Sequence, residues 1–116
     1  MQIRKIYQNV KPELIYEEIK DLVIKQGTVI QEAKLYTSAT QDDSSLFVSR
    51  GTITFSMEVG PEKAAKECLI LHLLGSDKSE TRVIFDIDEK LFTKERLNTL
   101  QSDLDFIFSS YEVKGR

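Results

Sequence analysis

The feature that most constrains the fold is a strict alternation of apolar and polar side chains over residues 52–59. Because successive side chains of a strand point to opposite faces, this pattern predicts a strand with one face in the core and one in water. The apolar positions of this segment, expected to face inward, are Ile53, Phe55, Met57 and Val59, and the polar positions are Thr52, Thr54, Ser56 and Glu58.

Other segments show the same period. Residues 3–7 predict a short first strand, and residues 29–36 predict a second, in which Val29, Ala33 and Leu35 face inward. Residues 82–88 predict a later strand, with Arg82 and the two aspartates outward. The polar stretch 37–45 is rich in turn-forming residues and predicts a hairpin loop.

Two segments instead have the period of a helix. The first is predicted to begin at Pro12, whose missing N–H costs nothing at a helix start, and to end at Gly27. The second begins at about Thr93. Within each segment, apolar residues recur along one face: Ile15, Ile19, Leu22 and Val23 in the first, and Leu97, Leu100, Leu104, Ile107, Phe108 and Tyr111 in the second.

Residues 62–74 are compatible with either element. The segment follows a proline and is rich in helix formers, yet as a strand it would carry Leu69, Leu71 and Leu73 on one face. The strand is favoured, because the turns on either side are spaced as in a meander. Cys68, Ile70 and His72 would then share the opposite face.

The resulting element order is β-α-β-β-β-β-α, an α+β fold in which a twisted antiparallel sheet carries both helices on one face. Residues 1–116 are expected to form a single domain, because a chain of this length can bury its own core.

This element order resembles that of TATA-binding-protein-like domains and, in shortened form, of helix-grip domains of the START type. The features that carry the resemblance are the helix start at Pro12-Glu13, the meander from Val29 to Ile87, and the closing helix from Thr93 to Tyr111. The resemblance concerns element order over nearly the whole chain, and it assigns a role to no individual residue.

Charge and composition limit the classes of partner and the cell compartment that we expect for this chain. The net charge is -3 and the basic residues are dispersed, which disfavours nucleic acid, although a basic stripe could assemble from scattered positions on folding. A single cysteine cannot form an internal disulfide, and the chain shows neither a signal peptide nor a membrane-length apolar run. We therefore expect a cytoplasmic protein without membrane association.

Chemical candidates are few. Cys68 and His72 form the sole potential nucleophile–base pair, since the chain has one of each residue type. On a helix the two could touch, whereas on a strand they would lie about 13 Å apart. Asp86 and Asp88 could offer oxygen ligands to a divalent cation. The favoured interpretation is that they lie on a solvated strand edge and pair with Arg82 or a lysine. No catalytic residue, metal or cofactor is therefore expected.

The closing helix offers the most distinctive surface. Opposite its core stripe lies a face without charge below the first turn: Thr99, Ser102, Phe106, Ser109, Ser110 and Val113. An uncharged helix face with a central aromatic residue is a candidate contact surface, and a two-fold homodimer is the leading hypothesis for it.

The favoured function is a non-enzymatic binding or assembly domain that acts through the last helix or the open sheet face and has a protein partner. The alternative is a carrier of a small apolar ligand held between the sheet and the closing helix. An enzyme is the least favoured class, because no catalytic signature is found.

Overall fold

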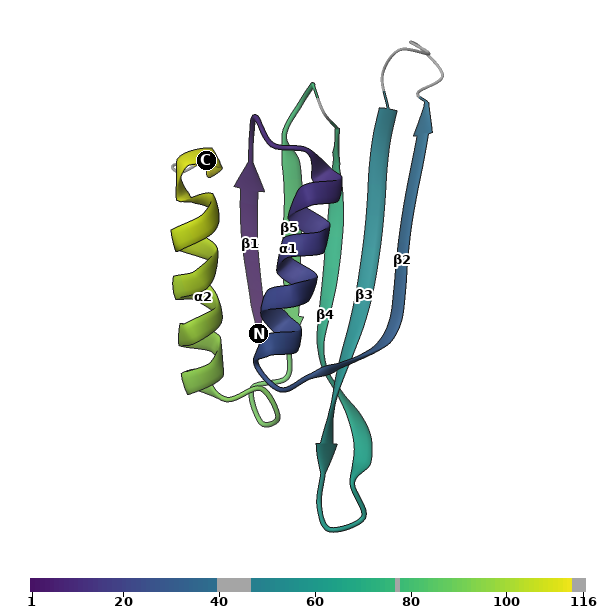
Figure 1. The fold of residues 1–116 in the computed structure, drawn as a ribbon, viewed down its shortest axis with the longest axis vertical. Coiled ribbons are helices and arrows are strands. Elements are labelled where there is room, and N and C mark those ends of the chain that lie inside the picture. The colour runs from purple at the N-terminus through teal and green to yellow at the C-terminus, as the bar shows by residue number, and fades with distance from the viewer. Residues whose placement is uncertain (40–46, 77, 114–116) are drawn as a thin grey trace.

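The computed structural model describes residues 1–39, 47–76 and 78–113. A five-stranded antiparallel sheet has the strand order β1-β5-β4-β3-β2 (Figure 1). The elements are β1 (Gln2–Tyr7), α1 (Pro12–Lys25), β2 (Val29–Ala39), β3 (Phe47–Val59), β4 (Ala64–Ser76), β5 (Thr81–Ile87), α2 (Lys94–Phe108) and the short 3₁₀ helix η1 (Ser109–Tyr111).

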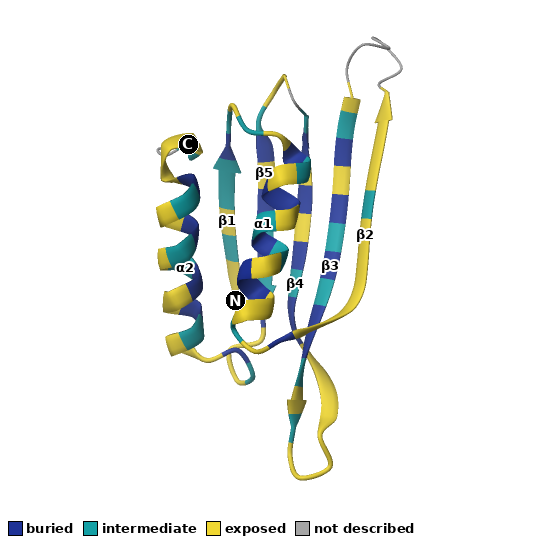
Figure 2. Ribbon diagram, viewed as in Figure 1, coloured by how far each residue is buried: buried dark blue, intermediate teal, exposed yellow. Residues whose placement is uncertain are grey.

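Both helices lie on the same face of the sheet, which confirms the predicted α+β architecture (Figure 1). The buried stripes of the helices turn toward the sheet, whereas β2 is exposed along almost its whole length (Figure 2). One core joins the two helices to β1, β3, β4 and β5. Its fully buried larger side chains include Tyr7, Ile15, Ile19, Ile53, Phe55, Leu71, Phe85, Phe92, Leu100, Leu104 and Phe108.

The helix boundaries follow local chemistry. Pro12 is the first residue of α1, and Gly27 beyond its end has a φ of 94°, a left-handed conformation that glycine adopts without a side-chain penalty. Thr93 caps α2 by accepting a hydrogen bond from the Arg96 amide. The expectation that Tyr111 joins the core stripe is wrong: α2 ends at Phe108, and the following 3₁₀ turn leaves Tyr111 exposed.

The segment that the sequence left ambiguous is strand β4, and Leu69, Leu71 and Leu73 are buried as expected for a strand. The expected side for Cys68 is wrong. The pairing with β3 passes from Phe55–Leu69 to Ser56–Glu67, so Cys68 is an extra residue at a β-bulge. The bulge shifts the alternation, and the thiol points into the core while His72 stays outside.

A second bulge corrects the expectation for β2. The register with β3 shifts between Ile30 and Glu32, so Val29 is out of phase with Leu35 and is exposed rather than buried. The strand also extends to Ala39, through the first three residues of the predicted hairpin loop. Residues 40–45 of that loop lie outside the described residues.

Side-chain contacts fix α1 on the sheet. Ser49 of β3 donates a hydrogen bond of 2.6 Å to Glu13 Oε1, and the Thr37 hydroxyl of β2 lies 3.0 Å from the Ser49 hydroxyl. The bond from Ser49 lowers the pKa of the Glu13 carboxyl, so the group stays ionised. Neither α1 nor α2 combines the length and apolar character that crossing a membrane requires, within the part of the chain described.

Candidate functional site

The sheet face opposite the helices carries two neighbouring rows of side chains, each crossing all five strands. We call these ten residues the open-face rows. Their members follow from the pairing registers of the strands. The first row is Tyr36, Arg50, Leu74, Arg82 and Ile6, and the second row is Lys34, Thr52, His72, Ile84 and Arg4.

The open-face rows hold four permanent cations and no carboxylate. Arg82 pairs with Glu80 at 3.1 Å, Lys34 pairs with Glu32 at 2.7 Å, and Arg4 donates to the amide oxygen of Gln2. Arg50 has no ion pair or hydrogen bond among the described residues. The rows are therefore a basic region of an acidic chain, in which Arg50 is the arginine without a partner in the part of the chain that the structure describes.

Apolar side chains lie between the cations. Leu74 is exposed and Ile84 half-buried on the solvent side of the sheet, where no helix covers them. Together with Arg50, His72 and Arg82 they line a shallow hollow of about 370 Å³. Tyr36, 65% exposed, lies at the β2 end of the same row. Tyrosine, arginine and aliphatic residues are the composition that buried centres of protein interfaces favour.

Cys68 and His72 do not form a reactive pair, because they point to opposite faces of β4. The Cys68 thiol is buried and donates a hydrogen bond of 3.5 Å to the carbonyl of Phe55. Burial raises the pKa of this thiol to about 11, so it stays protonated and is a poor nucleophile at neutral pH. His72 is half exposed, and its Nε2 lies 3.7 Å from Asp86 Oδ2.

The two aspartates considered as metal ligands bond to different partners. Asp86 faces His72, not Arg82 or a lysine as the sequence suggested, because Arg82 turns to Glu80. Asp88 follows β5, and its Oδ1 accepts a 3.0 Å hydrogen bond from the amide of Lys90. Among the described residues, no three acidic, histidine or cysteine side chains gather as a metal site would require.

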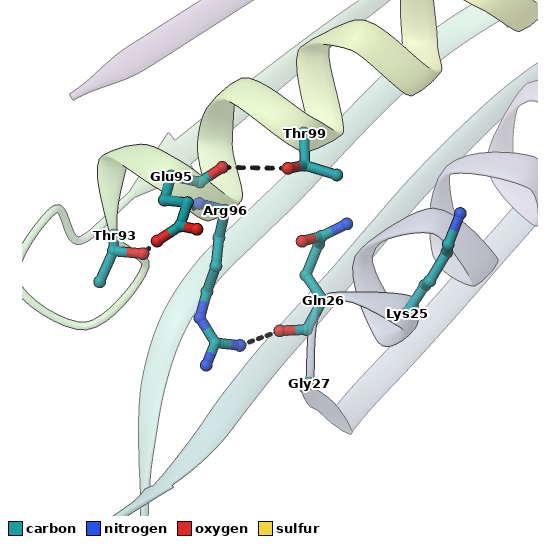
Figure 3. Close-up of a pocket in the computed structure, with 7 residues that line it drawn as sticks. All are labelled: Lys25, Gln26, Gly27, Thr93, Glu95, Arg96 and Thr99. Atoms are coloured by element: carbon teal, nitrogen blue, oxygen red, sulfur yellow. Dashed lines mark hydrogen bonds between the residues drawn. The ribbon is translucent and has the colours of Figure 1, made fainter.

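A polar cleft of about 550 Å³ lies between the end of α1 and the start of α2 (Figure 3). Two of its polar side chains bond to the backbone of the helix ends. The Arg96 guanidinium donates to the carbonyl of Gln26 at the end of α1, and the Thr99 hydroxyl donates to the carbonyl of Glu95. Arg96 thereby supplies a donor to the C-terminal end of α1, and the cleft is best explained as a helix-to-helix joint.

A partly buried ion-pair cluster near the C-terminus was not anticipated from the sequence. Lys5 Nζ lies 3.4 Å from Glu112 Oε1 and 3.9 Å from Asp105 Oδ1. The segment after α2 pairs with the end of β1, since the amide of Val113 donates to the carbonyl of Ile6 at 2.7 Å. The cluster therefore holds the C-terminal segment against β1.

Tyr7 lies beside this cluster, with its ring 5.3 Å from that of Phe108. Only 1% of Tyr7 is exposed, and its hydroxyl has no hydrogen-bond partner among the described residues. Burial raises the pKa of this phenol, and the nearby charges of Glu112 and Asp105 raise it further. The hydroxyl is thus neutral at any physiological pH and unsatisfied.

Replacing Tyr7 by phenylalanine is expected to raise the free energy of unfolding by about 1 kcal/mol. A buried hydroxyl without a partner loses its hydrogen bonds to water on folding and gains no bond within the protein. Urea denaturation would measure the change. Tyr111→Phe is the matched control, since Tyr111 is exposed and loses no burial penalty. If Tyr7→Phe instead lowered the free energy of unfolding by a kilocalorie or more, the Tyr7 hydroxyl would have to make a stabilising hydrogen bond in the folded protein.

The residues predicted on the outer face of α2 lie where the sequence indicated for the most part. Phe106 is 91% exposed, the largest value among the exposed hydrophobic residues described. Val113 is half-buried in the segment that pairs with β1, so it is at the margin of this face. The exposed polar neighbours of Phe106 are Thr99, Ser102, Ser109 and Ser110.

Sequence reasoning placed Lys34, Tyr36, His72 and Arg82 on outward faces but did not bring them together. Alternation within a strand fixes the face, while the rows depend on register between strands. Comparison of the chain with protein-family models, with curated proteins and with solved structures found no match.

Proposed function

We propose that this chain is a non-enzymatic binding domain that acts through the open face of its sheet. The observation that carries the proposal is the composition of the open-face rows: four cations, an exposed tyrosine, an exposed leucine and two half-buried isoleucines, without a carboxylate. Cations of this kind steer an oppositely charged partner, and the apolar side chains supply the burial that makes binding specific.

The catalytic alternatives find less support. Cys68 is buried and protonated, and His72 cannot reach it. His72 and Asp86 are both half exposed. Among the open-face rows, the one hydroxyl beside them is that of Thr52 in the adjacent strand. A binding surface accounts for the same residues without demanding a reaction.

The test is affinity capture with a matched pair of charge reversals. Protein immobilised as wild type, Arg50→Glu and Lys90→Glu would be exposed to extract of the cells that produce it, and bound proteins quantified by mass spectrometry. Arg50 lies in the open-face rows, whereas Lys90 is an exposed lysine in the loop after β5. We expect a partner retained by wild type and Lys90→Glu and lost with Arg50→Glu. An identical set of bound proteins on all three would contradict the proposal.

Assembly through α2 is a second candidate, favoured by the exposure of Phe106. A phenylalanine in water beside hydroxyl side chains can be desolvated at lower cost than one surrounded by charges, and Thr99, Ser102, Ser109 and Ser110 carry no charge. Two copies packed across a two-fold axis would cover both phenylalanines. Such a homodimer leaves the open-face rows accessible, since α2 lies on the opposite side of the sheet (Figure 1).

A carrier of a small apolar ligand has narrower support. A hollow of about 410 Å³ does lie beside α2, lined among others by Met1, Phe92 and Leu97. However, Phe92 and Leu97 are buried in the core beneath it, and charged Glu89 and Lys94 also line the hollow. An apolar ligand would therefore meet a mixed surface at the edge of the fold rather than an apolar interior site.

A further inference from the structure

We infer that the occupant of the open face is an amphipathic helix of another protein, with acidic side chains flanking its apolar stripe. This inference rests on the proposed function and names the partner of the same surface. Its parts are the shape of the apolar strip along β4, the position of the two arginines, and the layer that the fold leaves uncovered.

The apolar strip runs along the central strand. On the open face, β4 presents Ile70, His72 and Leu74 in succession, and Ile84 of β5 lies directly beside His72. From Ile70 to Leu74 the strand rises by roughly 13 Å, which corresponds to about two and a half turns of helix. One apolar stripe of a helix is therefore long enough to cover the strip.

The arginines flank this strip. Arg50 of β3 and Arg82 of β5 are the two neighbours of Leu74 in its row, one on each side. They are two strand spacings apart, roughly 10 Å, which matches the diameter of a helix with its side chains. A helix along β4 would bring carboxylates on one border of its apolar stripe to Arg50, and on the other border to Arg82, which is 67% exposed and already pairs with Glu80.

The charges around the apolar strip determine which of its ends suits acidic side chains of the partner helix. Acidic side chains fit at the Leu74 end, where Arg50 has no ion pair or hydrogen bond among the described residues. At the Ile70 end the neighbouring row contains Glu32 and Asp86, so a carboxylate there would be repelled.

The layer arrangement favours a helix over other occupants. α1 and α2 cover one face of the sheet, and a helix on the other face completes a three-layer packing. Single-stranded nucleic acid is less well matched: bases bind by stacking on aromatic rings, and among the ten residues of the open-face rows only Tyr36 and the His72 imidazole offer such rings, two strands apart. Aliphatic side chains such as Leu74 and Ile84 instead favour leucine-like side chains of a helix.

The inference is tested with designed probes and the intact protein. The first probe is a fluorescent peptide of about 18 residues, long enough to form a helix, with leucines on one stripe and glutamates along its borders. The second has lysine at every glutamate position, and the third is an oligothymidylate of similar length. Fluorescence anisotropy at low and high salt gives the affinities for wild type, Arg50→Glu and Lys90→Glu.

We expect the acidic peptide to bind wild type and Lys90→Glu alike, and Arg50→Glu about tenfold more weakly, because a close charge pair becomes a repulsion. Binding should weaken with salt, and the lysine peptide should not bind. Equal binding of both peptides, tighter binding of the oligothymidylate, an unaffected Arg50→Glu variant, or no binding at all would each overturn the inference. If the capture experiment still yields a partner that depends on Arg50, the proposed function survives and the class of partner is wrong.

Discussion

Replacing Leu104 by alanine is expected to lower the free energy of unfolding by about 2–5 kcal/mol, the range for truncating a buried leucine. Leu104 is 2% exposed and lies on the stripe of α2 that packs toward the sheet, between Leu100 and Phe108. These neighbours belong to the same close-packed core, so they can fill little of the space that the missing side chain leaves. Urea or guanidinium denaturation would measure the loss.

Phe106→Ala is the matched control on the same helix. Phe106 is separated from Leu104 by one residue but is almost fully exposed, so its truncation should change the stability of the monomeric chain, measured at a concentration too low for the proposed dimer, by less than about 0.5 kcal/mol. A loss below half a kilocalorie for Leu104→Ala, or equal losses for both variants, would mean that the core stripe of α2 is misassigned.

Replacing Phe106 by glutamate is expected to convert a homodimer into a folded monomer. In the proposed assembly each Phe106 is a central interface aromatic, whose loss typically costs about 2 kcal/mol or more, and a two-fold axis counts the loss twice. The dissociation constant should therefore rise by roughly a thousandfold. Analytical ultracentrifugation at micromolar concentration would show the change, and circular dichroism would show that the monomer is folded.

The control for this variant is Tyr36→Glu, which places the same charge on an exposed aromatic residue of the opposite face. It should leave the dimer intact. A monomeric wild type, or a dimer indifferent to Phe106→Glu, would refute assembly through α2. A dimer broken by Tyr36→Glu instead would indicate that copies meet through β2 and the open face.

Local patterns were sufficient to predict the elements and their layers. The alternation at Ile53 and Phe55 and the stripe at Leu100 and Leu104 identify buried faces, because each period belongs to one type of element. The strand favoured within residues 62–74 is confirmed by β4, which begins at Ala64. These features depend on neighbours in sequence, so the sequence contains the information directly.

The wrong predictions for Val29 and Cys68 and the failure to predict the open-face rows have the same cause, because all of them depend on contacts between strands. Val29 and Cys68 lie on unexpected sides because bulges shift the phase of β2 and β4, and no local pattern announced either bulge. The open-face rows were missed for the same reason. Arg4, Arg50 and Arg82 are far apart in sequence, and only the pairing registers bring them onto one surface.

The position of β1 beside β5 has a consequence for the way the chain acquires its structure. Gln2 pairs opposite Asp86, so β1, the first strand of the sheet to be synthesised, must wait for the last strand, β5, before it can join the sheet. Until then α1 can pack only on the β2–β4 part of the meander, and Tyr7 has no core to enter. Pairing partners so distant in sequence carry a large loop-closure entropy and slow the search for the native topology. We therefore expect the edge strand β1 and the C-terminal segment that closes over it to order together, late in folding.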